Sequence, residues 1–227
     1  MSLRLLSIAP VLLLAACGAE APAPKQEDAL EAPMEQPVMG PERRILAYGD
    51  SLFAGYGVDK SDSYPSKLEA ALRARGINAR VTNAGVSGDT TAAGLQRLGF
   101  TLDAQAEKPD LFILELGGND LLRALKPAET RSNLKAILDE LKRREIKVLI
   151  MGMRAPPNFG EFQAEFDAIY GDLAKQYDAA LYPFFLEEIY QQPELFQRDR
   201  VHPTPSGIAQ LVGATADVVS EALPTPE

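Results

Sequence analysis

The residues best suited to chemistry in this 227-residue chain are one serine and the single histidine. Ser51 lies in the segment AYGDSLFAGYG (47–57), between an acidic residue and glycines. A serine hydroxyl is a poor nucleophile at its ordinary pKa and needs a positioned base, usually histidine. The only histidine is His202, far along the chain. If Ser51 is a nucleophile, the fold must bring His202 beside it.

Three further residues complete a constellation for acyl transfer. Asp199 precedes His202 by three positions in RDRVHPT (198–204), so its carboxylate could hold one ring nitrogen while the other faces outward. Gly88 permits a close backbone approach to a substrate, and the Asn119 amide donates without adding charge. With the Ser51 backbone N–H, these two are candidates for stabilising an oxyanion.

The hydrophobic pattern shows which elements would position these residues. We expect strands at 44–48, 79–85, 110–118, 147–153 and 179–184, and helices at 63–76, 90–105, 126–145, 162–177 and 204–223. This alternation predicts a three-layer α/β fold with a central parallel five-stranded sheet. Ligands bind at the carboxyl ends of such strands. Ser51, Gly88 and Asn119 follow the first three strands.

Each motif taken alone also has a structural reading. Gly-Asp-Ser and Gly-Gly-Asn-Asp (117–120) are common turns, a lone histidine is often structural or exposed, and Asp199 could cap the closing region. Their joint order on strand-end loops favours chemistry.

Four segments together resemble the successive blocks of the GDSL, or SGNH, hydrolases: GDSLFAGYG, NAGVSGDTT, ELGGNDLLR and DRVHPT. The resemblance covers about residues 44–220 and is strongest to the bacterial thioesterase I, lysophospholipase L1 and arylesterase group. It implies a flavodoxin-like fold and a triad of Ser51, Asp199 and His202. It also implies an oxyanion hole of Ser51, Gly88 and Asn119.

The resemblance further implies a serine esterase that hydrolyses carboxylic esters and thioesters through an acyl-enzyme. The substrate would be a small acyl ester or lipid. No metal or cofactor is expected, because the sequence has no histidine pair, cysteine cluster or P-loop. Two alternatives stay open: a carbohydrate O-deacetylase on the same scaffold, and a non-catalytic lipid-binding envelope lipoprotein.

The substrate groove is expected to involve two segments. Related thioesterases tend to carry glycines after the Asn-Asp pair, whereas this chain has Leu121, Leu122, Arg123 and Leu125, which predicts a stiffer and more apolar rim. Pro156 and Pro157 would form the opposite wall, or would simply stiffen a connection.

The N-terminus indicates export. Residues 1–16 have the anatomy of a signal peptide, and Leu14-Ala15-Ala16-Cys17 resembles the bacterial lipoprotein cleavage box, which implies a lipid on Cys17. Residues 17–42, rich in Pro, Ala and Glu, would form a disordered tether before a hydrolase domain at 43–227. We therefore expect a periplasmic, membrane-anchored protein. The net charge of −9 argues against a nucleic-acid partner.

Overall fold

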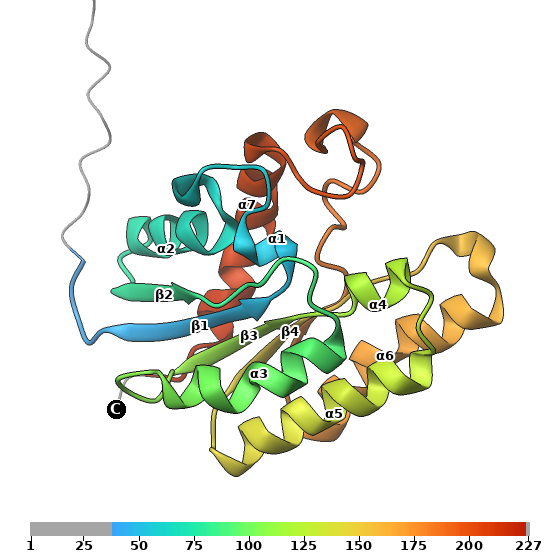
Figure 1. The fold of residues 1–227 in the computed structure, drawn as a ribbon. Helices are drawn as coiled ribbons and strands as arrows, with labels where there is room; N and C mark the ends of the chain where they lie inside the picture. The colour runs from blue at the N-terminus through green and yellow to red at the C-terminus, as the bar shows by residue number, and fades with distance from the viewer. Residues whose placement is uncertain (1–37, 226–227) are drawn as a thin grey trace, which may run out of the picture. The chain divides into compact units, whose positions relative to one another are not determined.

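The computed structural model describes residues 38–225 and contains the expected sheet (Figure 1). Its strands are β1 (Arg43–Gly49), β2 (Ala79–Asn83), β3 (Leu111–Glu115), β4 (Val148–Met151) and β5 (Ala180–Tyr182). They form one parallel sheet in the order β2-β1-β3-β4-β5. This is the flavodoxin-like order, so the predicted fold class is confirmed.

Helices cover both faces of the sheet (Figure 1). α2 (Tyr64–Ala74) and α7 (Pro205–Ala222) pack together on one face. α3 (Thr91–Asp103), α5 (Pro127–Arg143) and α6 (Glu161–Tyr177) form the other layer. Shorter elements are α1 (Ser51–Ala54), α4 (Gly118–Leu122), η1 (Lys60–Asp62), η2 (Pro157–Phe159) and η3 (Pro193–Leu195).

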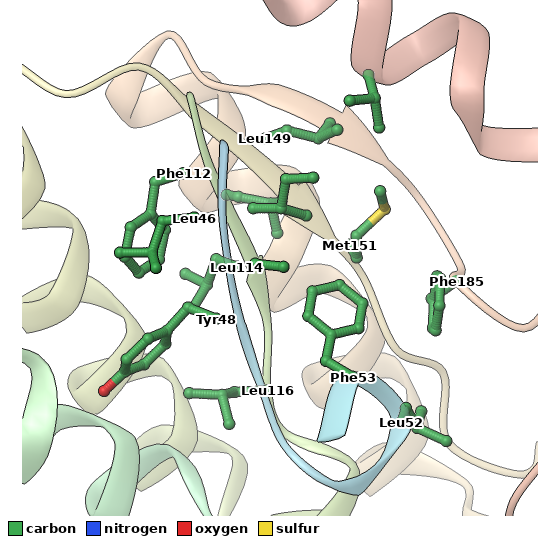
Figure 2. Close-up of a cluster of buried hydrophobic side chains, with 14 of the residues drawn as sticks. Leu46, Tyr48, Leu52, Phe53, Phe112, Leu114, Leu116, Leu149, Met151 and Phe185 are labelled. Carbon is green, nitrogen blue, oxygen red and sulfur yellow. The ribbon is translucent and has the colours of Figure 1, made fainter. Parts of the chain in front are cut away.

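The burial of the middle strand, β3, shows that the sheet lies between the two layers of helices. Every residue of β3 is buried, as expected for a parallel strand covered on both faces. Beside it, Leu46 and Tyr48 of β1 pack with Phe112 of β3 (Figure 2). The apolar run at 110–118 therefore contains the central strand of the sheet, and it ends beside the candidate active site.

The helix that carries Ser51 is held by aromatic packing. Phe53 of α1 stacks on Tyr64 of α2 with ring centroids 5.0 Å apart, and the edge of Phe185 meets both rings. The buried Tyr64 hydroxyl is 2.7 Å from the Thr215 hydroxyl, which joins α2 to α7. Close packing of this kind fixes α1 against α2, which in turn is joined to α7.

The five long helices lie where the sequence predicts them. Ser63 precedes α2, and its hydroxyl donates to the Lys60 carbonyl at 2.8 Å and lies 3.0 Å from the Ser66 hydroxyl, so no backbone N–H of the helix is capped by it. The two one-turn helices α1 and α4 have no counterpart among the predicted elements, because four or five residues show no periodicity.

Residues 1–37 lie outside the described part of the chain. The predicted signal peptide (1–16), the lipidated Cys17 and most of the tether (17–42) belong to it and stay predictions. Within residues 38–225, no helix combines the length and apolar character that a membrane crossing requires.

Candidate active site

Ser51 is the first residue of α1, directly after β1. The Asp50 side chain caps this turn, since its Oδ1 accepts from the Leu52 N–H at 3.0 Å. Gly55 ends the turn with a φ of 81°, in the left-handed region that glycine adopts without strain. The sequence GDSLFAG therefore builds a tight strand-to-helix turn that presents the Ser51 hydroxyl at the carboxyl edge of the sheet.

The structure brings Ser51, His202 and Asp199 together. His202 Nε2 is 2.9 Å from Ser51 Oγ, and His202 Nδ1 is 2.7 Å from Asp199 Oδ2. The ring of Tyr56 packs on the His202 imidazole with centroids 4.3 Å apart. The histidine is thus held on three sides, in an orientation that suits proton transfer to and from Ser51.

Asp199 is set up to remain ionised. Its Oδ1 accepts from the backbone N–H groups of Val201 and His202, both at 3.0 Å. Desolvation alone would raise its pKa, but the hydrogen bonds from the His202 ring and from these two amides lower the pKa of Asp199 to about 2. A carboxylate that stays charged can stabilise an imidazolium beside it.

Asn119 is oriented by the residue that precedes Ser51. Its side-chain Nδ2 donates to Asp50 Oδ2 at 2.9 Å, and both residues line the same cavity as Ser51. An amide nitrogen has two hydrogens, so the second is available to a substrate oxygen.

The loop that carries Gly88 is anchored from three directions. Gly88 has a φ of 86°, and its carbonyl accepts from Arg123 Nη2 at 2.8 Å. Arg97 binds the neighbouring Asp89 at 2.6 Å. At Gly85 an added Cβ would lie 2.3 Å from the Ala54 nitrogen, so only glycine lets the loop pass α1 so closely. Gly88 itself is not among the residues that line the cavity beside Ser51.

The Asn-Asp pair of the sequence divides into two tasks. Asn119 faces the site, whereas Asp120 is buried. Asp120 accepts from the Thr91 N–H at 2.8 Å and from the Thr130 hydroxyl at 3.1 Å. It therefore ties α4 to the beginning of α3 and to α5, and it fixes the position of Asn119.

Beneath the site lies a buried pair of carboxyl groups. Glu115 is fully buried, and its Oε2 accepts from the Asp50 N–H at 3.2 Å. Among the described residues, its Oε1 has no hydrogen-bond partner. Burial, and then the charge of Asp50, raise the pKa of Glu115 well above its ordinary value. Burial also raises the pKa of Asp50, against the opposing hydrogen bonds from Leu52 and Asn119.

We predict that Glu115 makes the free energy of unfolding depend on pH and that Glu115→Gln removes this contribution. The folded protein keeps the Glu115 proton after the unfolded chain has released it. The free energy of unfolding therefore falls with rising pH, by about 1.4 kcal/mol per pH unit from this group, between the unfolded and the folded pKa. Glutamine carries no such proton, so the variant gains stability relative to the wild type as pH rises. Urea unfolding of both proteins between about pH 5 and 8 measures this. A difference that stays constant with pH would contradict it.

A cavity of about 420 Å³ opens beside Ser51 and His202. Its wall is mostly apolar and includes Leu121, Leu122, Met153, Pro156, Phe184 and Leu186. Two arginines, Arg154 and Arg200, add positive charge. A pocket of this size and character suits a small ligand with an apolar part.

Three of the six residues predicted for the groove line this cavity: Leu121, Leu122 and Pro156. The other three do not. Arg123 extends to the Gly88 carbonyl, the Leu125 N–H binds the Asp120 carbonyl after α4, and Pro157 begins η2.

Sequence reasoning missed much of the wall and both supporting carboxyl groups. Phe184, Leu186, Tyr190 and Phe196 come from the irregular segment between β5 and α7, whose apolar residues follow no period. The run of aromatic and leucine residues there is the one available signal. Asp50 and Glu115 carry no signal of their own, since their roles depend on burial. Within residues 38–225, no cluster of three or more His, Cys, Asp or Glu side chains is placed to hold a metal ion.

The fold and the site define a class, the hydrolases with a flavodoxin-like sheet and a serine at the end of its first strand. The profile of the GDSL-like Lipase/Acylhydrolase family matches residues 47–209. Esterase TesA of Pseudomonas aeruginosa is 41% identical over 160 residues, which cover 70% of this chain and 79% of that protein. Thioesterase 1/protease 1/lysophospholipase L1 of Escherichia coli is 40% identical over 160 residues, covering 70% and 74%.

A solved structure agrees. The crystal structure of AlinE4, an SGNH-hydrolase family esterase, is 64% identical with a TM-score of 0.69, and covers 82% of this chain and all of that one. This chain belongs to the GDSL-like lipase/acylhydrolase family. It is a carboxylic ester hydrolase of the SGNH type.

Proposed function

We propose that the protein hydrolyses esters and thioesters of apolar acyl groups through an acyl-enzyme on Ser51. The proposal rests on one observation, which is the chain of two hydrogen bonds that joins Ser51, His202 and Asp199. His202 Nε2 lies 2.9 Å from Ser51 Oγ, and His202 Nδ1 lies 2.7 Å from Asp199 Oδ2. This relay opens onto the apolar cavity. It is the arrangement of nucleophile, base and orienting acid that acyl transfer needs.

In the first half-reaction, His202 Nε2 takes the Ser51 hydroxyl proton while Oγ bonds to the substrate carbonyl carbon. The carbonyl oxygen gains negative charge, and Asn119 Nδ2 with the backbone N–H groups of Ser51 and Gly88 stabilises it. His202 then gives its proton to the leaving oxygen or sulfur. The bond from the carbonyl carbon to that atom breaks, and the alcohol or thiol departs.

In the second half-reaction, water replaces the alcohol. His202 takes a proton from water as its oxygen attacks the acyl carbon. The bond to Ser51 Oγ breaks, Oγ recovers the proton from His202, and the carboxylic acid leaves. Asp199 stays ionised throughout and stabilises the imidazolium in each half.

The lining of the cavity supports an apolar acyl group of moderate length. Leu121, Leu122 and Met153 offer no partner for a sugar hydroxyl, which disfavours a carbohydrate acetyl ester. The names of the relatives, esterase and thioesterase/lysophospholipase, suggest carboxylic esters, acyl thioesters and lysophospholipids as substrate classes.

The test is hydrolysis of p-nitrophenyl esters from acetyl to palmitoyl by residues 42–227, with Ser51→Ala as the control. We expect the highest kcat/KM for medium chains. Activity on acetate alone would favour the O-deacetylase, and no activity on any ester would favour a binding protein.

We also propose that the protein is exported and held at the membrane from the periplasmic side by lipid on Cys17. The support is the sequence of residues 1–17, whose apolar stretch ends in Leu-Ala-Ala-Cys. Two or more acyl chains make such an anchor stable. Cys17→Ser is expected to abolish palmitate labelling and to release the protein from membranes. Retained labelling in the variant would refute the anchor.

A further inference from the structure

Arg200 stands out among the residues of the site because of its backbone. It lies in the loop before α7, two positions before His202, and has a φ of 61°. The left-handed region is costly for a residue with a Cβ, and glycine would occupy it with less strain. Backbone strain of this kind is found mainly at functional sites, where the strained residue often has a role.

The charge of Arg200 is uncompensated among the described residues. Arg154, the other arginine of the cavity, pairs with Glu187 at 2.8 Å. The neighbouring carboxylate of Asp199 is occupied by His202 and two backbone amides. Within residues 38–225, the Arg200 side chain forms no ion pair or hydrogen bond, and it lines the cavity. An exposed guanidinium at the mouth of an apolar pocket offers a binding group for an anion.

The proposed chemistry places the leaving group next to this arginine. His202 must give its proton to the leaving oxygen, so the alcohol part of the ester lies against the loop that carries His202. The acyl part would then lie against lining residues of other elements, such as Leu121 of α4 and Met153 after β4. Arg200 therefore faces the alcohol part.

We propose that Arg200 is a specificity residue that selects esters whose leaving alcohol or thiol carries an anionic group, such as a phosphate or a carboxylate. This inference rests on the proposed function, since it uses His202 as the proton donor to the leaving group. It deepens that function by naming the charge of the leaving group. A protein with net charge −9 would repel anionic substrates at long range. A local positive charge at the site would offset this repulsion and favour their binding.

The test compares the ratio of kcat/KM for an anionic and a neutral ester of the same acyl chain. The anionic substrate is 4-(butanoyloxy)benzoate and the neutral one is 4-(butanoyloxy)benzamide. In Arg200→Gln we expect this ratio to fall about fivefold, the upper end for an exposed ion pair. Arg200→Lys keeps the charge and should retain most of the ratio. Added NaCl should lower the ratio in the wild type and leave it nearly constant in Arg200→Gln.

Arg198→Gln is the matched control, because it removes one positive charge from the same loop at a residue outside the cavity lining. We expect it to leave the ratio unchanged. An unchanged ratio in Arg200→Gln, or an equal fall in Arg198→Gln, would overturn the proposal.

A second pair of substrates tests which side of the ester Arg200 faces. p-Nitrophenyl hemisuccinate carries its carboxylate on the acyl part, and p-nitrophenyl butanoate is its neutral partner. A larger effect of Arg200→Gln on this pair would overturn the assignment to the leaving group. If the wild type hydrolysed none of the four esters, the proposed function itself would fail, which is a different result from a lost preference.

Discussion

Ser51→Ala is expected to lower kcat for ester hydrolysis about 10⁶-fold, to a rate set by binding and the remaining hydrogen-bond donors. The reason is geometric: Ser51 Oγ is the atom that His202 Nε2 reaches, at 2.9 Å. Alanine leaves the imidazole without a proton to accept and removes the atom that would carry the acyl group. The fold should be retained, since the change removes one oxygen that faces the cavity.

Labelling with a fluorophosphonate measures the same property without a substrate. The reagent should attach to Ser51 in the wild type and fail to attach in Ser51→Ala. Ser87, which lies exposed on the loop of Gly88, gives a matched control, and Ser87→Ala should label like the wild type. Labelling that survives in Ser51→Ala would identify another nucleophile.

Asp199→Asn is expected to lower kcat about 10⁴-fold while leaving KM nearly unchanged. The asparagine side chain can still accept from the Val201 and His202 amides, as Asp199 does. It cannot, however, supply a negative charge beside the ring, and it can stabilise the tautomer with its hydrogen on the wrong nitrogen. The loss therefore falls on the transition state.

The pH profile separates this role from a general loss of structure. Because the pKa of Asp199 is lowered to about 2, the wild-type aspartate stays ionised wherever the enzyme is folded and active. Titration of Asp199 itself should then contribute nothing to the pH profile of activity, so the loss in Asp199→Asn should be present at every pH at which the protein is folded. A loss that only follows a fall in the folded fraction, measured by circular dichroism, would instead make Asp199 structural.

Much of the fold could be predicted from the sequence because its signals are strong and local. The apolar run 110–118 contains β3, and Pro127 begins α5 as a residue suited to a first helical turn. The order of Ser51, Gly88, Asn119, Asp199 and His202 on strand-end loops also indicated the site, and the geometry brings Ser51, Asn119, Asp199 and His202 to one edge.

The remainder depends on burial and direction, which a sequence does not carry. Arg123 follows two leucines of the groove, yet it turns to the Gly88 carbonyl, and nothing in its neighbours distinguishes these two directions. In the sequence, Glu115 is simply one polar residue at the end of a strand. Its pKa is raised only because the fold buries it fully beside Asp50. The positive φ of Arg200 likewise could not be predicted from the segment RDRVH (198–202).

The two ends of the domain meet at the site, since Ser51 opens its first helix and His202 lies in the loop before its last. During synthesis, Ser51 therefore leaves the ribosome long before His202. A chain that is still being made lacks the contact between Ser51 and His202, so we expect it to have no ester-hydrolysing activity. Catalytic competence in this protein arrives only with completion of the chain, which makes ester hydrolysis a direct readout of finished folding.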